Sequence, residues 1–204
     1  MTILEYNNHM WSYYLQLETD FLNTLNYVEF AEDNFGVYSK EYAIQLLSIC
    51  SEIDVVFKKL CEKIDFNHTR ENIIDYSQIL SNFDGLTTTK VKFKYNSLEY
   101  LPFENWSTDT TLFWWKDYNC VKHHRLDDDN NKKANLKNVF YALAALFLLN
   151  RFYCKTICAN KRMKEPVVKS KLFEVVGWEL CIPVGNGFVQ VLRTNGNIGL
   201  IYDG

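Results

Sequence analysis

Glycine and proline are scarce in this chain, with 8 and 3 residues among 204. Folds with many tight turns need both residue types, because glycine tolerates positive φ and proline presets the turn backbone. Their scarcity disfavours a loop-rich or many-turned β architecture. Hydrophobic residues make up 48% of the chain and aromatic residues 16%, so we expect one substantial core and long helices.

Long apolar runs are also missing. The best candidate, residues 139–149, is an eleven-residue run closed by Asn150 and Arg151, whereas a membrane-spanning helix needs roughly 20 residues. The first Lys or Arg is Lys40, so the start of the chain lacks the basic residues that open a signal peptide. We therefore expect a cytoplasmic protein with no membrane segment, and a buried helix at residues 139–149.

Recognisable disulfide, metal and cofactor motifs are absent as well. The six cysteines form no CxxC pair and lie mostly among apolar residues, as core residues do in a reducing compartment. The spacing of Cys154 and Cys158 is loose for zinc, and Asp127 to Asp129 lack the pattern of a calcium loop. Since no glycine-rich phosphate loop is present either, we expect no metal and no cofactor.

Charge is unevenly distributed, although the net charge is only −3. Residues 1–39 hold six acids and no Lys or Arg, and residues 151–171 hold seven cations and one acid. This polarity suits an anionic ligand on one side of the molecule, or a dimer that pairs acidic with basic surfaces. A solvated face is the simpler explanation for either run.

The spacing of apolar residues predicts a mainly α fold. Five segments have helical spacing: residues 4–32, 39–64, 69–82, 107–125 and 133–160. Ser39 is expected to cap the second of these helices, and Ser107 or Thr108 the fourth. The last two are joined by a short acidic loop, so they must be antiparallel neighbours.

Two β elements are expected beside the helices. Strict alternation predicts a β-hairpin at about residues 89–101, inserted between helices. From Leu172 onward, short β-prone runs and Gly-containing turns predict a small antiparallel meander. We therefore divide the chain into an antiparallel helical bundle over residues 1–165 and a small β accessory element over residues 166–204.

The densest group of chemically versatile side chains lies between Trp114 and Arg125. On a helix, Asn119 and His123 share one face with Lys122 beside them, while Tyr118, Lys122 and Arg125 form the neighbouring stripe. Two simpler explanations exist: the cations finish a helix at its negative end, or His123 is a satisfied buried histidine.

As chemistry, the group suits metal-independent RNA cleavage, in which the RNA 2′-hydroxyl is the nucleophile. His123 is the candidate general base or acid because imidazole titrates near neutral pH. Lys122 and Arg125 would offset the charge that builds on the phosphorane, and Asn119 would orient the imidazole or the phosphate.

The order of these residues resembles the HEPN superfamily, helical-bundle proteins of toxin–antitoxin, abortive-infection and CRISPR-associated systems. The resemblance covers about residues 36–160. A family signature Arg, usually followed by Asn, His or Asp, precedes a His by four to six residues. Asn119 and His123 match this pattern, whereas Tyr118 stands at the Arg position. Asp54, followed by a basic pair, is a loose counterpart of an upstream acidic residue seen in some members.

The resemblance implies a HEPN-like endoribonuclease of a prokaryotic anti-phage defence or toxin–antitoxin system. It further implies RNA as substrate, a homodimer whose two protomers complete one site, and a protein partner from the same operon. Because Tyr118 replaces the signature Arg, a second interpretation stays open. In it, a non-catalytic HEPN-like module binds RNA, a nucleotide or a partner protein as a sensing or regulatory subunit. A structural subunit without a ligand is the third.

Overall fold

The structure, a computed structural model, describes residues 1–158, 166, 168–178, 180–184, 187–194 and 197–202. For residues 180–202 only the backbone is described. Within these ranges the chain is mainly helical, as the apolar spacing predicted. The helices are α1 (Ile3–Glu5), the π-helical η1 (Tyr6–Trp11), α2 (Ser12–Thr24), the 3-10 turn η2 (Glu32–Asn34), α3 (Lys40–Ile64), α4 (Ile73–Leu80), α5 (Phe113–His124), the 3-10 turn η3 (Asn130–Lys133) and α6 (Leu136–Ile157).

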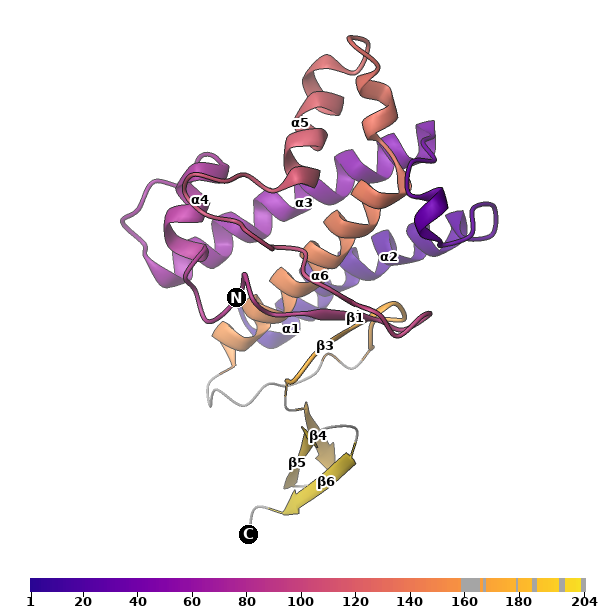
Figure 1. Cartoon of the computed structure of the whole chain (residues 1–204). Coiled ribbons are helices and arrows are strands. Elements are labelled where there is room, and N and C mark those ends of the chain that lie inside the picture. Colours follow the sequence, from indigo (N-terminus) through magenta and orange to yellow (C-terminus); the bar gives the residue numbers. More distant parts are fainter. Residues whose placement is uncertain (159–165, 167, 179, 185–186, 195–196, 203–204) are drawn as a thin grey trace.

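Helix α6 crosses the middle of the molecule (Figure 1). It contacts α2, α3, α5 and β3, and its turns between Val139 and Leu149 are buried except for the partly exposed Tyr141. The buried helix predicted for residues 139–149 is therefore confirmed. In the described part of the chain, no helix is long and apolar enough to cross a membrane.

Helix α3 is the other main part of the core. The Ser39 side chain caps it by accepting a hydrogen bond from the Tyr42 amide at 3.0 Å, as predicted. Its apolar stripe, including Leu46, Ile49 and Ile53, is fully buried. Because this stripe faces α6, the two longest helices form the centre around which the rest is arranged.

Three predicted helix boundaries are wrong. The first helical segment ends at Thr24 instead of residue 32, since Phe30 packs against the core with its ring centre 4.6 Å from that of Phe140. The third begins after Asn72, whose side chain accepts from two backbone amides. The fourth begins after Leu112, because Ser107 caps a local turn through the Asp109 and Thr110 amides instead.

The predicted hairpin is confirmed. Strands β1 (Val91–Phe93) and β2 (Glu99–Tyr100) pair antiparallel, with Val91 opposite Tyr100. A third strand, β3 (Phe173–Val175), pairs with the other edge of β1 and places Val175 opposite Val91. The first sheet therefore has the order β2-β1-β3 and lies against the helices.

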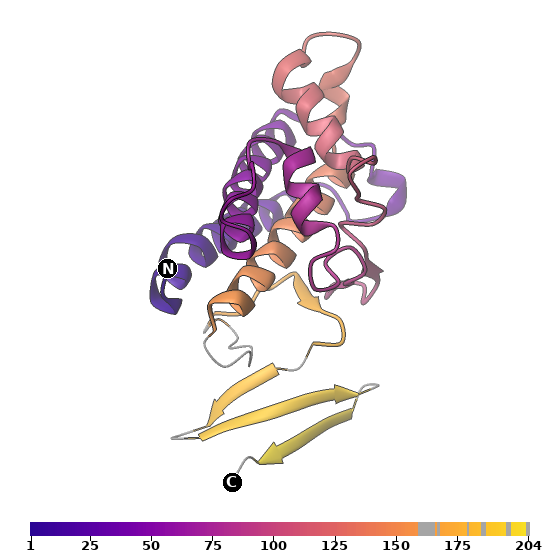
Figure 2. The same ribbon diagram turned by 90° about the vertical axis from the view of Figure 1, so that its left-hand side faces the viewer.

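The C-terminal meander is also present, but it lacks the strand predicted at its start. Strands β4 (Leu180–Val184), β5 (Gly187–Thr194) and β6 (Asn197–Tyr202) form an antiparallel sheet in chain order. In Figures 1 and 2, β3 lies between the helices and this sheet. The strand predicted at the beginning of the meander is β3, which joined the hairpin because β1 offers it a free edge. The domain boundary expected after residue 165 lies outside the described residues.

A buried carboxylate ties the segment before β3 to α2. Glu18 is 1% exposed and accepts hydrogen bonds from the Tyr14 hydroxyl at 2.7 Å and from the Leu172 amide at 3.1 Å. The Lys171 amide donates to it at 2.9 Å, and the Ser170 hydroxyl is a further donor. One of the six acids in residues 1–39 is therefore an internal structural group, so that acidic run is not entirely a solvated face.

Candidate functional site

Aromatic packing fixes the orientation of α5, the helix that carries the polar group. The Trp114 indole donates to the Pro102 carbonyl at 2.9 Å, and the Trp115 ring meets Phe57 of α3 edge to face at 6.0 Å. Both tryptophans are buried. With this side of α5 turned inward, the last turn presents its polar side chains to solvent.

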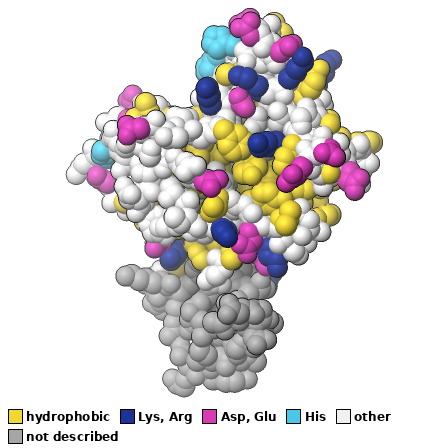
Figure 3. All heavy atoms as spheres, viewed as in Figure 1, with side chains coloured by type: hydrophobic (Ala, Val, Ile, Leu, Met, Phe, Trp, Pro, Cys, Tyr) yellow, Lys and Arg dark blue, Asp and Glu magenta, His cyan; other side chains and the backbone are white. Residues whose placement is uncertain are grey.

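The structure brings three of the five predicted residues together on that last turn. Lys122, His123 and Arg125 are exposed, and Asn119 is partly exposed one turn earlier. Figure 3 shows histidine and cationic side chains gathered around the projecting end of α5. The Lys122 ammonium lies 5.6 Å from the ring centre of Tyr118. We call Lys122, His123 and Arg125 the α5 tip.

Tyr118 does not belong to this surface. It is 5% exposed, and its ring lies 5.1 Å from that of Trp115. Burial raises the pKa of its hydroxyl to about 12, with smaller contributions from Cys50 and Asp54. Tyr118 is therefore neutral and turned inward, where it supports α5 instead of facing a phosphate.

One of the two simpler explanations for the polar group, a satisfied buried histidine, does not fit the geometry. His123 is exposed, so it is not a buried histidine. The carbonyl of His124 at the end of α5 accepts from the Asp127 amide and from the Asn130 side chain, each at 3.0 Å. Asn130 therefore supplies a hydrogen bond to the helix end, while Lys122 and His123 lie in the last turn of α5, where the negative end of a helix favours cations, so that simpler explanation stays open.

Of the four acidic residues close in sequence to the α5 tip, Asp128 is exposed and the other three contact other cations. Asp127 lies 3.4 Å from His124, Asp129 lies 2.7 Å from Lys132, and Asp117 lies 3.5 Å from Lys133. Among the described residues, no carboxylate lies within 4.0 Å of Lys122 or Arg125. Both cations are consequently available to an anion from solution.

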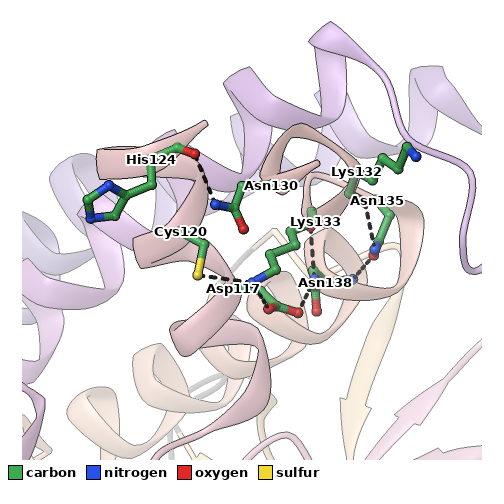
Figure 4. A network of polar contacts seen from close by, with 8 residues as sticks. All are labelled: Asp117, Cys120, His124, Asn130, Lys132, Lys133, Asn135 and Asn138. Carbon is green, nitrogen blue, oxygen red and sulfur yellow. Dashed lines mark hydrogen bonds and ion pairs between the residues drawn. The ribbon is translucent and has the colours of Figure 1, made fainter. Parts of the chain in front are cut away.

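A polar network that the sequence did not predict holds the α5 tip in place (Figure 4). The Lys133 ammonium contacts the Cys120 sulfur at 3.0 Å and Asp117, and these contacts raise the Lys133 pKa. The buried Asn138 donates to Asp117 at 2.9 Å and to the Lys133 carbonyl at 2.8 Å. The polar residues gathered around the start of α6 were the available signal. The network joins α5 to α6, so the tip is a rigid corner.

In the described part of the basic run at residues 151–171, Arg151 and Lys155 are engaged within the fold, whereas Lys169 and Lys171 are exposed. Arg151 is 3% exposed. Lys155 pairs with Asp84 at 2.6 Å and lies 5.2 Å from the ring centre of Trp178. Lys161, Arg162 and Lys164 lie outside the described residues. Arg151 and Lys155 therefore serve packing and pairing within the fold.

The second part of the family resemblance, at Asp54, is occupied by structural contacts. The Tyr76 hydroxyl donates to Asp54 at 2.7 Å, and the Lys58 ammonium lies 2.5 Å from its other oxygen. These contacts join α4 to α3. Asp54 thus has a role in packing that needs no ligand.

A hollow of about 730 Å³ lies beside the α5 tip, between the start of α3 and the loop after α5. Arg125 and Leu126 form one wall, and Tyr38, Lys40 and Ile44 form the other. We call it the α3–α5 groove. Nothing in the sequence pattern pointed to it, because its two walls are about 85 residues apart along the chain.

Within the ranges that the structure describes, no three His, Cys, Asp or Glu side chains are grouped so that they could hold a metal ion. Cys50, Cys61, Cys154 and Cys158 are buried, as expected of core residues.

Comparisons with protein-family models, with curated proteins and with solved structures give no match to this chain.

Proposed function

We propose that the protein is a HEPN-like RNA-binding module of a prokaryotic defence or toxin–antitoxin system, and that the α5 tip contacts RNA phosphates. One observation supports it most strongly. Lys122 and Arg125 project within one turn of a rigid helix end, and the described residues offer them no carboxylate. Phosphate contacts of this kind supply most of the sequence-independent affinity for nucleic acids.

The pattern Asn119-x-x-Lys122-His123 supports RNA over other anions, because it is the part that resembles the HEPN superfamily. The burial of Tyr118 favours binding over cleavage by one protomer. The family's signature Arg would stand at that position, and here an inward-facing tyrosine occupies it. The proposal includes a cytoplasmic location, a homodimer and a protein partner from the same operon.

Cleavage of the bound RNA is the second candidate function. His123 is exposed, and Asn119 lies one helical turn away on the same side. The imidazole would take the proton of the 2′-hydroxyl as that oxygen attacks the adjacent phosphorus. The P–O5′ bond would break, and the leaving 5′-oxygen would take a proton from solvent, which gives a 2′,3′-cyclic phosphate and a 5′-hydroxyl. Lys122 and Arg125 would offset the charge of the phosphorane, and a second protomer would complete the site.

RNA binding is tested with a labelled 30-nucleotide RNA in EDTA, using the variant Lys122→Gln/Arg125→Gln. We expect weaker binding at every salt concentration, and a log–log salt slope reduced by about 1 to 2, since two phosphate contacts are lost. The matched control is Lys59→Gln/Lys63→Gln, which removes two exposed cations at the other end of the bundle. Equal affinity and slope in all three proteins would disprove the binding proposal.

Cleavage is tested separately with total RNA in excess EDTA. Wild-type protein is compared with His123→Ala and with His124→Ala, which removes the neighbouring exposed imidazole. Cleavage that is lost only in His123→Ala, with circular dichroism unchanged, would establish the enzyme. Binding without cleavage in all three would leave the non-catalytic module as the function.

A further inference from the structure

The α3–α5 groove gathers several large apolar side chains that are open to solvent. Leu126 is 92% exposed, Ile44 is 60% exposed and Tyr38 is 47% exposed, and all three line the same hollow. Single exposed apolar residues are common, but a group of them around one concave surface marks an interaction site. The groove is therefore built for contact with an apolar group.

Backbone contacts fix the shape of the groove before any occupant arrives. Tyr38 forms a β-bridge with Asn135, and the Ser39 amide donates to the Ala134 carbonyl at 3.4 Å. On the opposite wall, the Asn130 side chain holds the end of α5 next to Leu126. A preformed groove loses little conformational entropy on binding, which favours affinity.

The charges at the rim have one predominant sign. Lys40 and Arg125 stand at the groove, and the described residues include no acidic partner for either. Among the described residues that line the groove, Asp129 is the single carboxylate, and it is paired with Lys132 at 2.7 Å. An occupant that carries carboxylates next to an apolar anchor would complement both features.

We propose that the α3–α5 groove binds an acidic segment of a protein partner, which inserts one apolar side chain between Leu126 and Ile44 and directs carboxylates toward Lys40 and Arg125. Protein is favoured over RNA because the exposed walls are largely hydrocarbon. A nucleobase would gain one stacking ring, Tyr38, and little for its polar edges. This binding does not depend on the proposed function.

Because Arg125 belongs to both the groove and the α5 tip, the acidic segment would also cover part of the proposed RNA surface. A bound peptide should therefore weaken RNA binding. If the protein does not bind RNA, peptide binding remains measurable by itself, so the two proposals fail separately.

The test is selection of peptides from a random displayed library on the immobilised full-length protein, followed by anisotropy titration of the selected peptide. We expect a consensus of one large apolar residue flanked by Asp or Glu. Leu126→Asp should weaken the selected peptide tenfold or more, since it removes the apolar wall and adds a repelling charge. Lys40→Glu should weaken it several-fold at low salt and less at high salt.

The matched control is Leu98→Asp, at a leucine that is 53% exposed in the hairpin turn. It should bind the peptide like wild type. All three substitutions lie on exposed positions, so the variants should fold, and circular dichroism checks this. The proposal is overturned if no peptide is enriched, or if enriched peptides bind Leu126→Asp as tightly as wild type.

Two other results would assign the groove to a different occupant and thus also reject the acidic segment. One is a wild-type dimer in light scattering that becomes a monomer in Leu126→Asp, which would indicate a second copy of this chain. The other is the absence of any enriched acidic peptide together with binding of a short uridine oligonucleotide that is lost in Tyr38→Ala but kept in Tyr38→Phe.

Discussion

Glu18 is the residue whose environment differs most from what its type suggests. Carboxylates are rarely buried unless they are paired or hydrogen-bonded. Here a tyrosine hydroxyl, a serine hydroxyl and two backbone amides surround the Glu18 carboxylate. These donors come from α2 itself and from the segment before β3, so one side chain connects two distant parts of the chain.

Replacing Glu18 with Gln should lower the free energy of unfolding by about 2–3 kcal/mol. The amide has the same shape, but its NH₂ group would face donors, and charge-assisted hydrogen bonds would be lost. Urea unfolding followed by circular dichroism measures the change. The exposed Glu29 gives a control, because Glu29→Gln should change stability little. Equal stabilities of the two variants would show that the Glu18 contacts contribute nothing.

Glu52 should make stability depend on pH. It is partly buried, and burial raises its pKa from the usual 4.5 to about 7. Below pH 4.5 the carboxyl group is mostly protonated in both the folded and the unfolded state, so Glu52 does not lower the free energy of unfolding there. As the pH rises from 4.5 to 7, the unfolded chain ionises this group more readily than the folded protein, in which burial disfavours the charge. The folded state therefore loses stability relative to the unfolded state over this range.

The variant Glu52→Gln should keep the stability that the wild type loses as the pH rises. Between pH 5 and 7.5 the wild type should lose about 1–2 kcal/mol relative to this variant, after allowance for the solvent that reaches the side chain. Urea titrations at four pH values give the comparison, with Glu29→Gln again as control. Parallel curves for wild type and Glu52→Gln would contradict the raised pKa.

At the scale of elements, the corner formed by α5, η3 and α6 depends on Asn138. Its side chain satisfies both Asp117 and the Lys133 carbonyl. The substitution Asn138→Ala should cost about 1–3 kcal/mol, because it leaves polar groups inside the corner without a partner. Hydrogen exchange at residues 124–133 should become faster. Asn8→Ala, at an exposed asparagine, is the control, and unchanged exchange at the corner would reject this role.

Elements with a strong local period could be predicted from the sequence. The stripe of α3, its Ser39 cap, the buried α6 run and the β1–β2 hairpin all follow from short-range patterns. Boundaries failed where tertiary contacts decide, as at Phe30, which leaves the helical pattern to pack on Phe140. The position of β3 could not be foreseen, because its pattern fits an edge strand of either sheet equally well.

The candidate site, too, could be predicted only where local patterns decide. Spacing on a helix correctly placed Lys122 and His123 on the exposed end of α5. It could not show that Tyr118 faces inward, because a tyrosine has both an apolar ring and a polar hydroxyl and can lie on either side of a helix. Nor could it reveal the α3–α5 groove, whose walls meet only after the chain has folded.

At the scale of the whole molecule, the strand pairings show where the chain can be shortened. β3 belongs to the sheet that covers the helices, whereas β4, β5 and β6 pair only with one another in the described part of the chain. Leu172 and Phe173 are buried against the core. Leu172, Phe173 and β3 therefore pack with the helical unit.

A chain that stops after residue 178 should keep a melting temperature close to that of the full chain. A chain that stops after residue 165 should melt about 10 °C lower or more, because it loses two buried apolar side chains and the donors to Glu18. Scanning calorimetry of the two shortened proteins and the full chain makes this comparison. Similar melting of both shortened proteins would show that β3 is dispensable.

The contact between Glu18 and Ser170 spans 152 residues, and this separation sets an order of events during synthesis. A ribosome adds about 5–20 residues per second, so Glu18 is synthesised roughly 8–30 s before the residues that donate hydrogen bonds to it. During that interval α2 can form, but the surface destined for Leu172 and Phe173 stays open to water. The nascent chain therefore presents an unfinished apolar face to chaperones until its last segment is translated.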